Sequence, residues 1–155
     1  MSRKEYIPEK EAGIWLDQEH AYIIIMRLEG KSRAEVLEVD LQEEYEELEK
    51  NQRSDHQFMN KSREGQENQH RLNFYKRLVE QIKDINYVYL FGPGNSKHQF
   101  SNYIERSGKR LPLKVAAIDS ADKLTQPQMI EQVKSYFASL RFEDFKRTLF
   151  EEQNR

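Results

Sequence analysis

The apolar residues of this chain fall into short runs and helical stripes, and the clearest unit occupies residues 86–108. Residues 87–91 (YVYLF) are almost continuously apolar, a pattern typical of a strand that is covered on both faces. The Gly-Pro-Gly sequence at 92–94 cannot continue this strand, because proline donates no backbone hydrogen bond and glycine adopts angles closed to other residues. We therefore predict a central strand that ends in a tight turn.

The residues after this turn predict an amphipathic helix. Ser96 followed by Gln99 matches a capping box, in which two side chains satisfy the first backbone amides of a helix. Gly108 is placed to end the helix. The apolar face of the expected helix consists of Phe100, Tyr103 and Ile104.

Three further runs precede this unit, at residues 12–17, 21–28 and 33–39. Short polar turns separate them, and the third run alternates between apolar and polar positions as a half-exposed strand does. Together they predict an antiparallel meander of three strands.

Helical patterns flank the central unit on both sides. A helix is expected from residue 67, with Leu72, Tyr75, Val79 and Ile82 on its apolar face. A strand is expected at 113–118, and Thr125 with Gln128 predicts a second capping box before a stripe of Ile130, Val133, Phe137 and Leu140. Residues 142–152 predict a separate short helix within a C-terminal helical tail at 142–155, with Phe145 and Leu149 facing inward.

This order of elements predicts one α/β domain over residues 1–155. The last two strands each need a crossover helix and should run parallel, so the sheet is expected to be mixed and five-stranded, with helices on both faces. Strand 87–91 should lie inside it, beside strand 21–28 or strand 113–118. Residues 40–66 are acidic at first, then polar with little periodicity, and predict a long mobile loop.

Composition narrows the class of protein. The chain has no cysteine, which excludes disulfides and cysteine-based metal or redox sites. It has no apolar run that could span a bilayer and no secretion signal at its start, so we expect a cytoplasmic protein. Residues 61–114 contain 11 Lys/Arg and 5 Asp/Glu, a net charge of +6 in a chain of net charge −2. This pattern is equally consistent with a local face for a polyanion and with an ordinary solvated charged surface.

Several motifs, taken in order, resemble a family of translation proteins. They are GIWLDQEHAYIII at 13–25, the helix from residue 69, YLFGPGNSK at 89–97, VAAID at 115–119 and the helix at 125–137. This order resembles the middle domain of the archaeal and eukaryotic class I peptide-chain release factors and of Pelota, and the small bacterial relatives often labelled translational machinery proteins. The resemblance implies a ribonuclease-H-like fold and a ribosomal or ribosomal-RNA partner.

The same resemblance locates a candidate loop. In release factors a Gly-Gly-Gln loop precedes the long helix and helps water attack peptidyl-tRNA, whereas this chain has Arg63, Glu64, Gly65 and Gln66 there. Because a carboxylate replaces the first glycine, and the length leaves no room for codon-reading domains, we expect a non-enzymatic protein with a degenerate loop, no catalytic residues and no cofactor. The candidate RNA or anion contacts are Arg63, Gly65, Gln66, Arg71, Lys76, Gly92, Gly94, Lys97, Lys109 and Arg110.

Two other functions stay open. The chain could be a protein-interaction module without RNA binding, with a partner docked on the C-terminal helix. It could also be a nuclease of ribonuclease-H-like fold, in which Asp17 and Asp119, with Glu80 as a third ligand, hold magnesium. Turn and cap roles explain these carboxylates better, and the release-factor family that the chain resembles uses no such metal site. The four histidines have no metal-ligand spacing and are expected on the surface, and Trp15 is expected in the core. No metal site is predicted.

Overall fold

The computed structural model describes residues 11–27, 33–40, 63–107 and 113–153 of the 155-residue chain. Within these residues the chain forms five strands and three helices. In chain order they are β1 (Glu11–Leu16), β2 (His20–Arg27), β3 (Arg33–Asp40), α2 (Arg63–Gln81), β4 (Tyr87–Gly92), α3 (Ser96–Ser107), β5 (Lys114–Ser120) and α4 (Gln126–Gln153). None of the described helices is long and apolar enough to cross a membrane.

The strands form one mixed sheet in the order β3-β2-β1-β4-β5. β2 pairs antiparallel with β1 and with β3, whereas β4 pairs parallel with both β1 and β5. The predicted mixed α/β fold is thereby confirmed. The apolar strand at 87–91 is internal and lies beside β5, as expected, and its other neighbour is β1.

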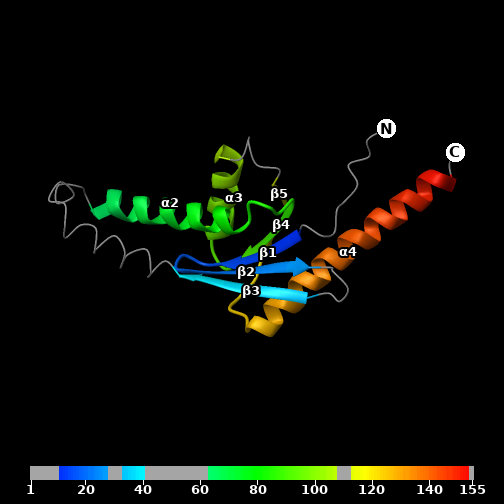
Figure 1. Ribbon diagram of the computed structural model, residues 1–155, viewed down its shortest axis with the longest axis horizontal. Helices are drawn as coiled ribbons and strands as arrows, with labels where there is room; N and C mark the ends of the chain where they lie inside the picture. Colours follow the sequence, from blue (N-terminus) through cyan, green and yellow to red (C-terminus); the bar gives the residue numbers. More distant parts are fainter. Residues whose placement is uncertain (1–10, 28–32, 41–62, 108–112, 154–155) are drawn as a thin grey trace.

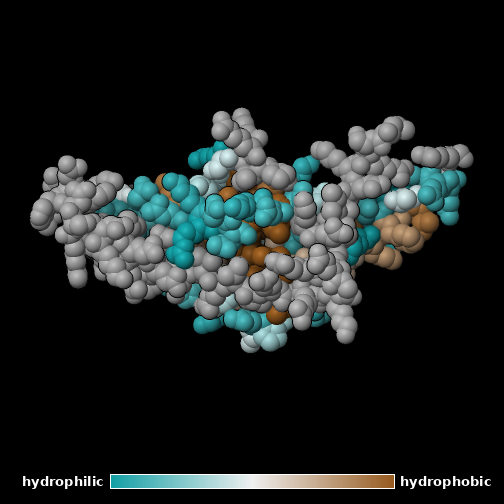
Figure 2. Space-filling view, in the orientation of Figure 1, coloured by the Kyte–Doolittle hydropathy of each residue, from teal (hydrophilic) through white to brown (hydrophobic). Residues whose placement is uncertain are grey.

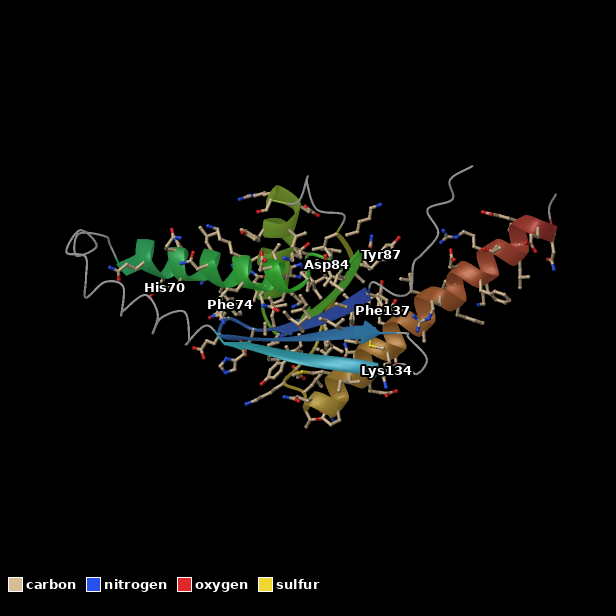
Figure 3. The ribbon with its side chains drawn as sticks, viewed as in Figure 1. His70, Phe74, Asp84, Tyr87, Lys134 and Phe137 are labelled. Atoms are coloured by element: carbon tan, nitrogen blue, oxygen red, sulfur yellow. The ribbon has the colours of Figure 1, made fainter. Side chains whose placement is uncertain are left out.

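Helices cover both faces of the sheet (Figure 1). α2 and α3 pack on one face, over a core that includes Ile14 and Leu90, while α4 packs on the other face against Trp15 and Phe91. Phe74 of α2 and Phe137 of α4 mark these two layers in Figure 3, and both side chains are fully buried. The near-continuous apolar sequence of β4 follows from this arrangement, because each of its faces meets a helical layer.

α4 approaches the sheet closely at one glycine. A Cβ added to Gly13 of β1 would lie 2.2 Å from Cγ2 of Val133, which is a severe overlap. The missing side chain of Gly13 therefore lets the helix seat Val133 directly on the strand.

α2 differs from its sequence prediction at its start. It begins at Arg63, so Arg63–Gln66 form its first turn and not the end of a loop. Glu64, Gln66 and Glu67 are good helix formers, and Gly65 opposes the helix by only about 1 kcal/mol relative to alanine. Residues 41–62 of the predicted loop lie outside the described residues.

The apolar face of α2 also differs from the prediction. Leu72 was assigned to it but is exposed, whereas Phe74 is buried. Tyr75, Leu78 and Ile82 complete the buried stripe. The error arises because Leu72 lies about 105° around the helix axis from the centre of that buried stripe, so it faces away from the core although it is apolar.

α4 is continuous where a break was predicted. Residues 142–152 extend the same helix to Gln153, because no glycine or proline interrupts the sequence after Pro127. The predicted inward placement of Phe145 and Leu149 is wrong, since both side chains are exposed. This half of α4 runs beyond the sheet (Figure 1), so it has no core to face.

The capping box at the start of α4 is confirmed. The Thr125 amide donates to Gln128 Oε1 at 2.9 Å, and the Gln128 amide donates to Thr125 Oγ1 at 3.3 Å. The box predicted for α3 is not formed in that way: Ser96 is already helical, and the Asn95 carbonyl accepts the amides of His98 and Gln99.

Candidate functional site

The turn after β4 depends on two glycines with positive φ. Gly92 has φ of 143°, and a Cβ there would lie 2.3 Å from the backbone oxygen of Leu16, so no other residue fits without moving β1. Gly94 has φ of 63°, but the space around its missing side chain is open. The first glycine therefore holds the ends of β1 and β4 together, and the second only turns the chain toward α3.

Lys97 braces this turn from within. Its side chain is 4% exposed, and its Nζ donates a hydrogen bond of 2.5 Å to the carbonyl of Gly94. A lysine this buried cannot reach a phosphate on a partner without leaving the carbonyl. Lys97 is thus better explained as a support of the turn than as a direct contact.

Tyr75 fixes α2 against the start of α3. Its ring centroid lies 5.3 Å from that of Phe100 and 5.5 Å from that of Tyr103, and its hydroxyl donates to Gln99 Oε1 at 3.4 Å. Burial raises the pKa of the Tyr75 hydroxyl, and the nearby positive charge of Arg71 partly offsets this. These contacts anchor the middle of α2 beside the turn.

The first half of α2 projects past the sheet from this anchor (Figure 1). Residues 63–75 span about 18 Å at 1.5 Å per residue, which carries Gly65 and Gln66 well away from the sheet. Gly65 is exposed and Gln66 is half-buried, both with helical backbone. Gly65 and Gln66 therefore lie near the end of a projecting helix.

The candidate basic residues do not form one patch. Arg71 is half-buried and Lys76 exposed, and the two lie about 140° apart around α2, whereas Lys97 is buried. The side chain of Arg63, together with Lys109 and Arg110, lies outside the described residues. What the structure does bring to one end of the sheet is the turn with Gly92 and Gly94 and the anchored middle of α2.

The carboxylates considered as metal ligands have other partners. Asp17 Oδ1 accepts the amides of Glu19 at 2.8 Å and of His20 at 2.6 Å, which is turn chemistry. Asp119 Oδ2 accepts the hydroxyl of Tyr89 at 2.7 Å, and Glu80 pairs with Lys83 on the surface of α2. Among the described residues, no three acidic or histidine side chains are grouped as a metal site would require.

A tyrosine network behind β4 was not predicted from sequence. The Tyr89 hydroxyl donates to Asp119 and accepts from Gln132 Nε2 at 3.0 Å, and its ring stacks on Tyr136 with centroids 4.2 Å apart. Burial and the adjacent Asp119 raise the pKa of Tyr89 to about 12. Since Tyr89 lies on β4, Asp119 on β5, and Gln132 and Tyr136 on α4, no spacing within one motif could have indicated the network.

Two smaller predictions have mixed outcomes. Trp15 is in the core, and its Nε1 donates to the carbonyl of Asp122 at 3.1 Å, so it is not a platform for a base. Of the histidines expected on the surface, His98 is exposed but His70 on α2 is buried (Figure 3). His56 lies outside the described residues.

Comparison with known proteins gives matches of structure only. No protein-family model and no curated protein matches the sequence. Among solved structures, the chain is similar to Thermoplasma acidophilum Pelota, with 18% identity over 76% of this chain and 29% of that one and a TM-score of 0.46. It is also similar to Archaeoglobus fulgidus Pelota, with 12% identity over 87% and 35% of the two chains and a TM-score of 0.47.

A third similar structure is an archaeal translation termination factor, with 17% identity over 91% of this chain and 42% of that one and a TM-score of 0.39. The resemblance to Pelota and the release factors read from the sequence motifs therefore recurs among the structural matches. In each case this chain spans less than half of the length of the matched protein.

Proposed function

We propose that this chain is a non-enzymatic, translation-associated protein that binds the ribosome or ribosomal RNA in the cytoplasm. The observation that carries the proposal is the position of Gly65 and Gln66 at the end of a helix that projects past the sheet. The sequence motifs that resemble release factors put their functional loop at this point of the chain. A ribonuclease-H-like fold is part of the proposal, and the strand order β3-β2-β1-β4-β5 supports it.

The proposed binding surface is the projecting half of α2, and the turn at 92–94 supports its base. Arg71 on this half of the helix and Lys76 just after it are proposed as phosphate contacts, with Arg63, Lys109 and Arg110 as further contacts. Their positions on different sides of α2 count against one continuous RNA-binding face. The net charge of +6 over residues 61–114 supplies the long-range attraction.

The test is co-sedimentation of the chain with ribosomes across a series of salt concentrations. We expect binding to weaken steeply with salt, and Arg71→Glu to weaken it further and to reduce the slope of log affinity against log salt by about 1. Lys83→Glu is the matched control, because it makes the same charge change on an exposed residue just after the other end of α2. Absence of co-sedimentation at low salt, or an equal effect of the two variants, would reject the proposal.

A second candidate is a protein-interaction module. The observation that favours it is the exposed apolar half of α4, which none of the described strands covers. No observation of comparable weight favours a nuclease, because the side chains of Asp17 and Asp119 already serve the β1–β2 turn and the tyrosine network.

A further inference from the structure

The C-terminal half of α4 carries an apolar stripe that does not face the sheet. Phe142, Phe145 and Leu149 are 56%, 59% and 42% exposed, although residues of this kind are usually buried. Figure 2 shows hydrophobic atoms gathered at this projecting end of the helix. Lys146 lies over the Phe142 ring, with Nζ 4.5 Å from its centroid, and leaves the rest of the stripe open.

The stripe lies on nearly the opposite side of α4 from the residues that contact the sheet. At 100° per residue, Ala138, Phe142, Phe145 and Leu149 are centred about 150° around the axis from Met129, Val133 and Phe137. Those three are buried against the sheet, whereas Ala138 is exposed. The stripe could therefore not be buried by bending α4 toward its own sheet, because it lies on the other side of the helix.

The spacing of the stripe indicates what covers it. Positions 138, 142, 145 and 149 are separated by four, three and four residues, which is the a/d spacing of a helix that packs on another helix. We propose that the occupant is α4 of a second copy of this chain, packed antiparallel about a two-fold axis.

The stripe is self-complementary in that arrangement. A two-fold axis near residues 143–144 places Leu149 over the small Ala138 of the partner subunit, and Phe142 over Phe145 of the partner subunit. Glu131, Ser135 and Ala138 are all exposed, so the second helix can lie along the outer face of α4 without displacing the sheet. The small residues upstream accommodate the large residues downstream.

The flanking charges favour the antiparallel orientation. A parallel pair would bring Arg141 beside Lys146 of the partner subunit, two like charges at the edge of the seam. The antiparallel pair instead sets Arg141 near Thr148 of the partner subunit, and Lys146 near Ser139 of the partner subunit. Like charges are therefore kept apart in only one of the two orientations.

The size of the stripe sets the strength of the dimer. A phenylalanine offers about 150–250 Å² in all. The dimer brings together four of them, Phe142 and Phe145 from each subunit, and because each is somewhat more than half exposed they supply roughly 400 Å². Stable interfaces bury about 1,200–2,000 Å², and the rest must come from the polar flanks. We therefore expect a weak dimer that forms as the concentration of the chain rises.

Sedimentation equilibrium of the full chain over a wide concentration range tests the assembly. The unmodified chain should pass from monomer to dimer, and Leu149→Asp should weaken the dimer tenfold or more. Leu72→Asp is the control, because Leu72 on α2 is also 42% exposed and lies outside the stripe. A chain that stays monomeric throughout, or a dimer weakened equally by both variants, would overturn the proposal.

Cysteine cross-linking tests the orientation of the two helices. Because the natural chain has no cysteine, only the introduced thiols can form a disulfide. A mixture of Ala138→Cys and Leu149→Cys chains should oxidise to the mixed dimer, because the antiparallel seam brings these positions within disulfide distance. In the same seam, two Leu149→Cys chains have their thiols about 16 Å apart along the axis and should not link. Efficient linking of Leu149→Cys with itself would refute the antiparallel pair.

Discussion

One charge pair connects the start of β1 to the middle of α4. The side chain of Glu11, the first residue of β1, is fully buried, and its Oε1 accepts a hydrogen bond of 2.6 Å from Nη1 of Arg141. Burial raises the pKa of Glu11 above its ordinary value, while the hydrogen bond and charge of Arg141 lower it in part. The Arg141 side chain remains 34% exposed, so the pair lies at the boundary between the packed and the projecting halves of α4.

We predict that Arg141→Met destabilises the chain by about 3 kcal/mol near pH 7, because it leaves a buried carboxylate without its partner. The variant raises the folded-state pKa of Glu11 further. Its stability should therefore fall as pH rises from 4.5, the ordinary value, through the raised folded value, and the deficit should shrink near pH 4.5.

Urea unfolding of both proteins at pH 5 and pH 8 measures this difference. Glu11→Gln/Arg141→Met serves as control, because it removes the titrating group and should remove the extra pH dependence. An equal loss of stability at both pH values would contradict the assignment of the effect to Glu11.

At the scale of elements, the sequence predicts those parts that have a packing partner along their whole length. Strand 87–91 and the Thr125–Gln128 box could be predicted because local pattern and tertiary role agree there. Phe145 and Leu149 could not, because their apolar character was assigned to a core that ends before they do, and Leu72 could not, because it lies beside the buried face of α2 and not on it. The periodicity of the sequence shows which side of a helix is apolar, but it does not show whether the sheet or another helix packs against that side.

The candidate site shows the same division. The need for Gly92 and Gly94 could be predicted from the break in pattern, since their φ values are closed to most residues. Burial of Lys97 and the link from Tyr89 to Asp119 and Gln132 could not, because they depend on how separate elements meet.

We predict that Gly13→Ala is destabilising by about 1–3 kcal/mol, although alanine suits a strand at least as well as glycine. The added Cβ would meet Val133 at 2.2 Å, and a branched side chain on a packed helix has little freedom to move away. Val133→Ala should lose stability as a large-to-small core change.

The double variant Gly13→Ala/Val133→Ala tests the pairing. Its loss of stability should be smaller than the sum of the two single losses, because shortening Val133 makes room for the new methyl group. Thermal or urea unfolding of all four proteins measures this coupling. Strict additivity would mean that α4 does not depend on Gly13 for its close approach.

At the scale of the whole molecule, the two long helices leave the sheet at opposite ends (Figure 1). The projecting N-terminal end of α2 carries polar residues around Gly65 and Gln66, whereas the projecting C-terminal end of α4 carries an apolar stripe. A polar end suits a charged, hydrated partner and an apolar end suits a protein surface. The sheet therefore separates the two proposed binding surfaces, which differ in chemistry, and we expect that each can be disabled without the other.

The first of these surfaces is expected to bind without catalysis. Gln66 lies in the helical first turn of α2, two residues after Glu64, which stands where the proposed match to the release-factor motif would have a glycine. A glutamine amide assists hydrolysis only when it is held beside the ester, and a misplacement of about 1 Å costs roughly a hundredfold. A helical backbone with a nearby carboxylate provides neither the freedom nor the charge that such placement beside RNA needs.

We therefore predict that release of labelled peptide from peptidyl-tRNA on isolated ribosomes stays at background for the natural chain and for Gln66→Ala alike. Glu64→Gly is the informative comparison, because it restores the Gly-Gly-Gln sequence and weakens the first helical turn by about 1 kcal/mol. Release that appears in Glu64→Gly and disappears in Glu64→Gly/Gln66→Ala would trace the inactivity to position 64. Release by the natural chain that is lost in Gln66→Ala would instead make this protein a hydrolase, and the non-enzymatic assignment would be wrong.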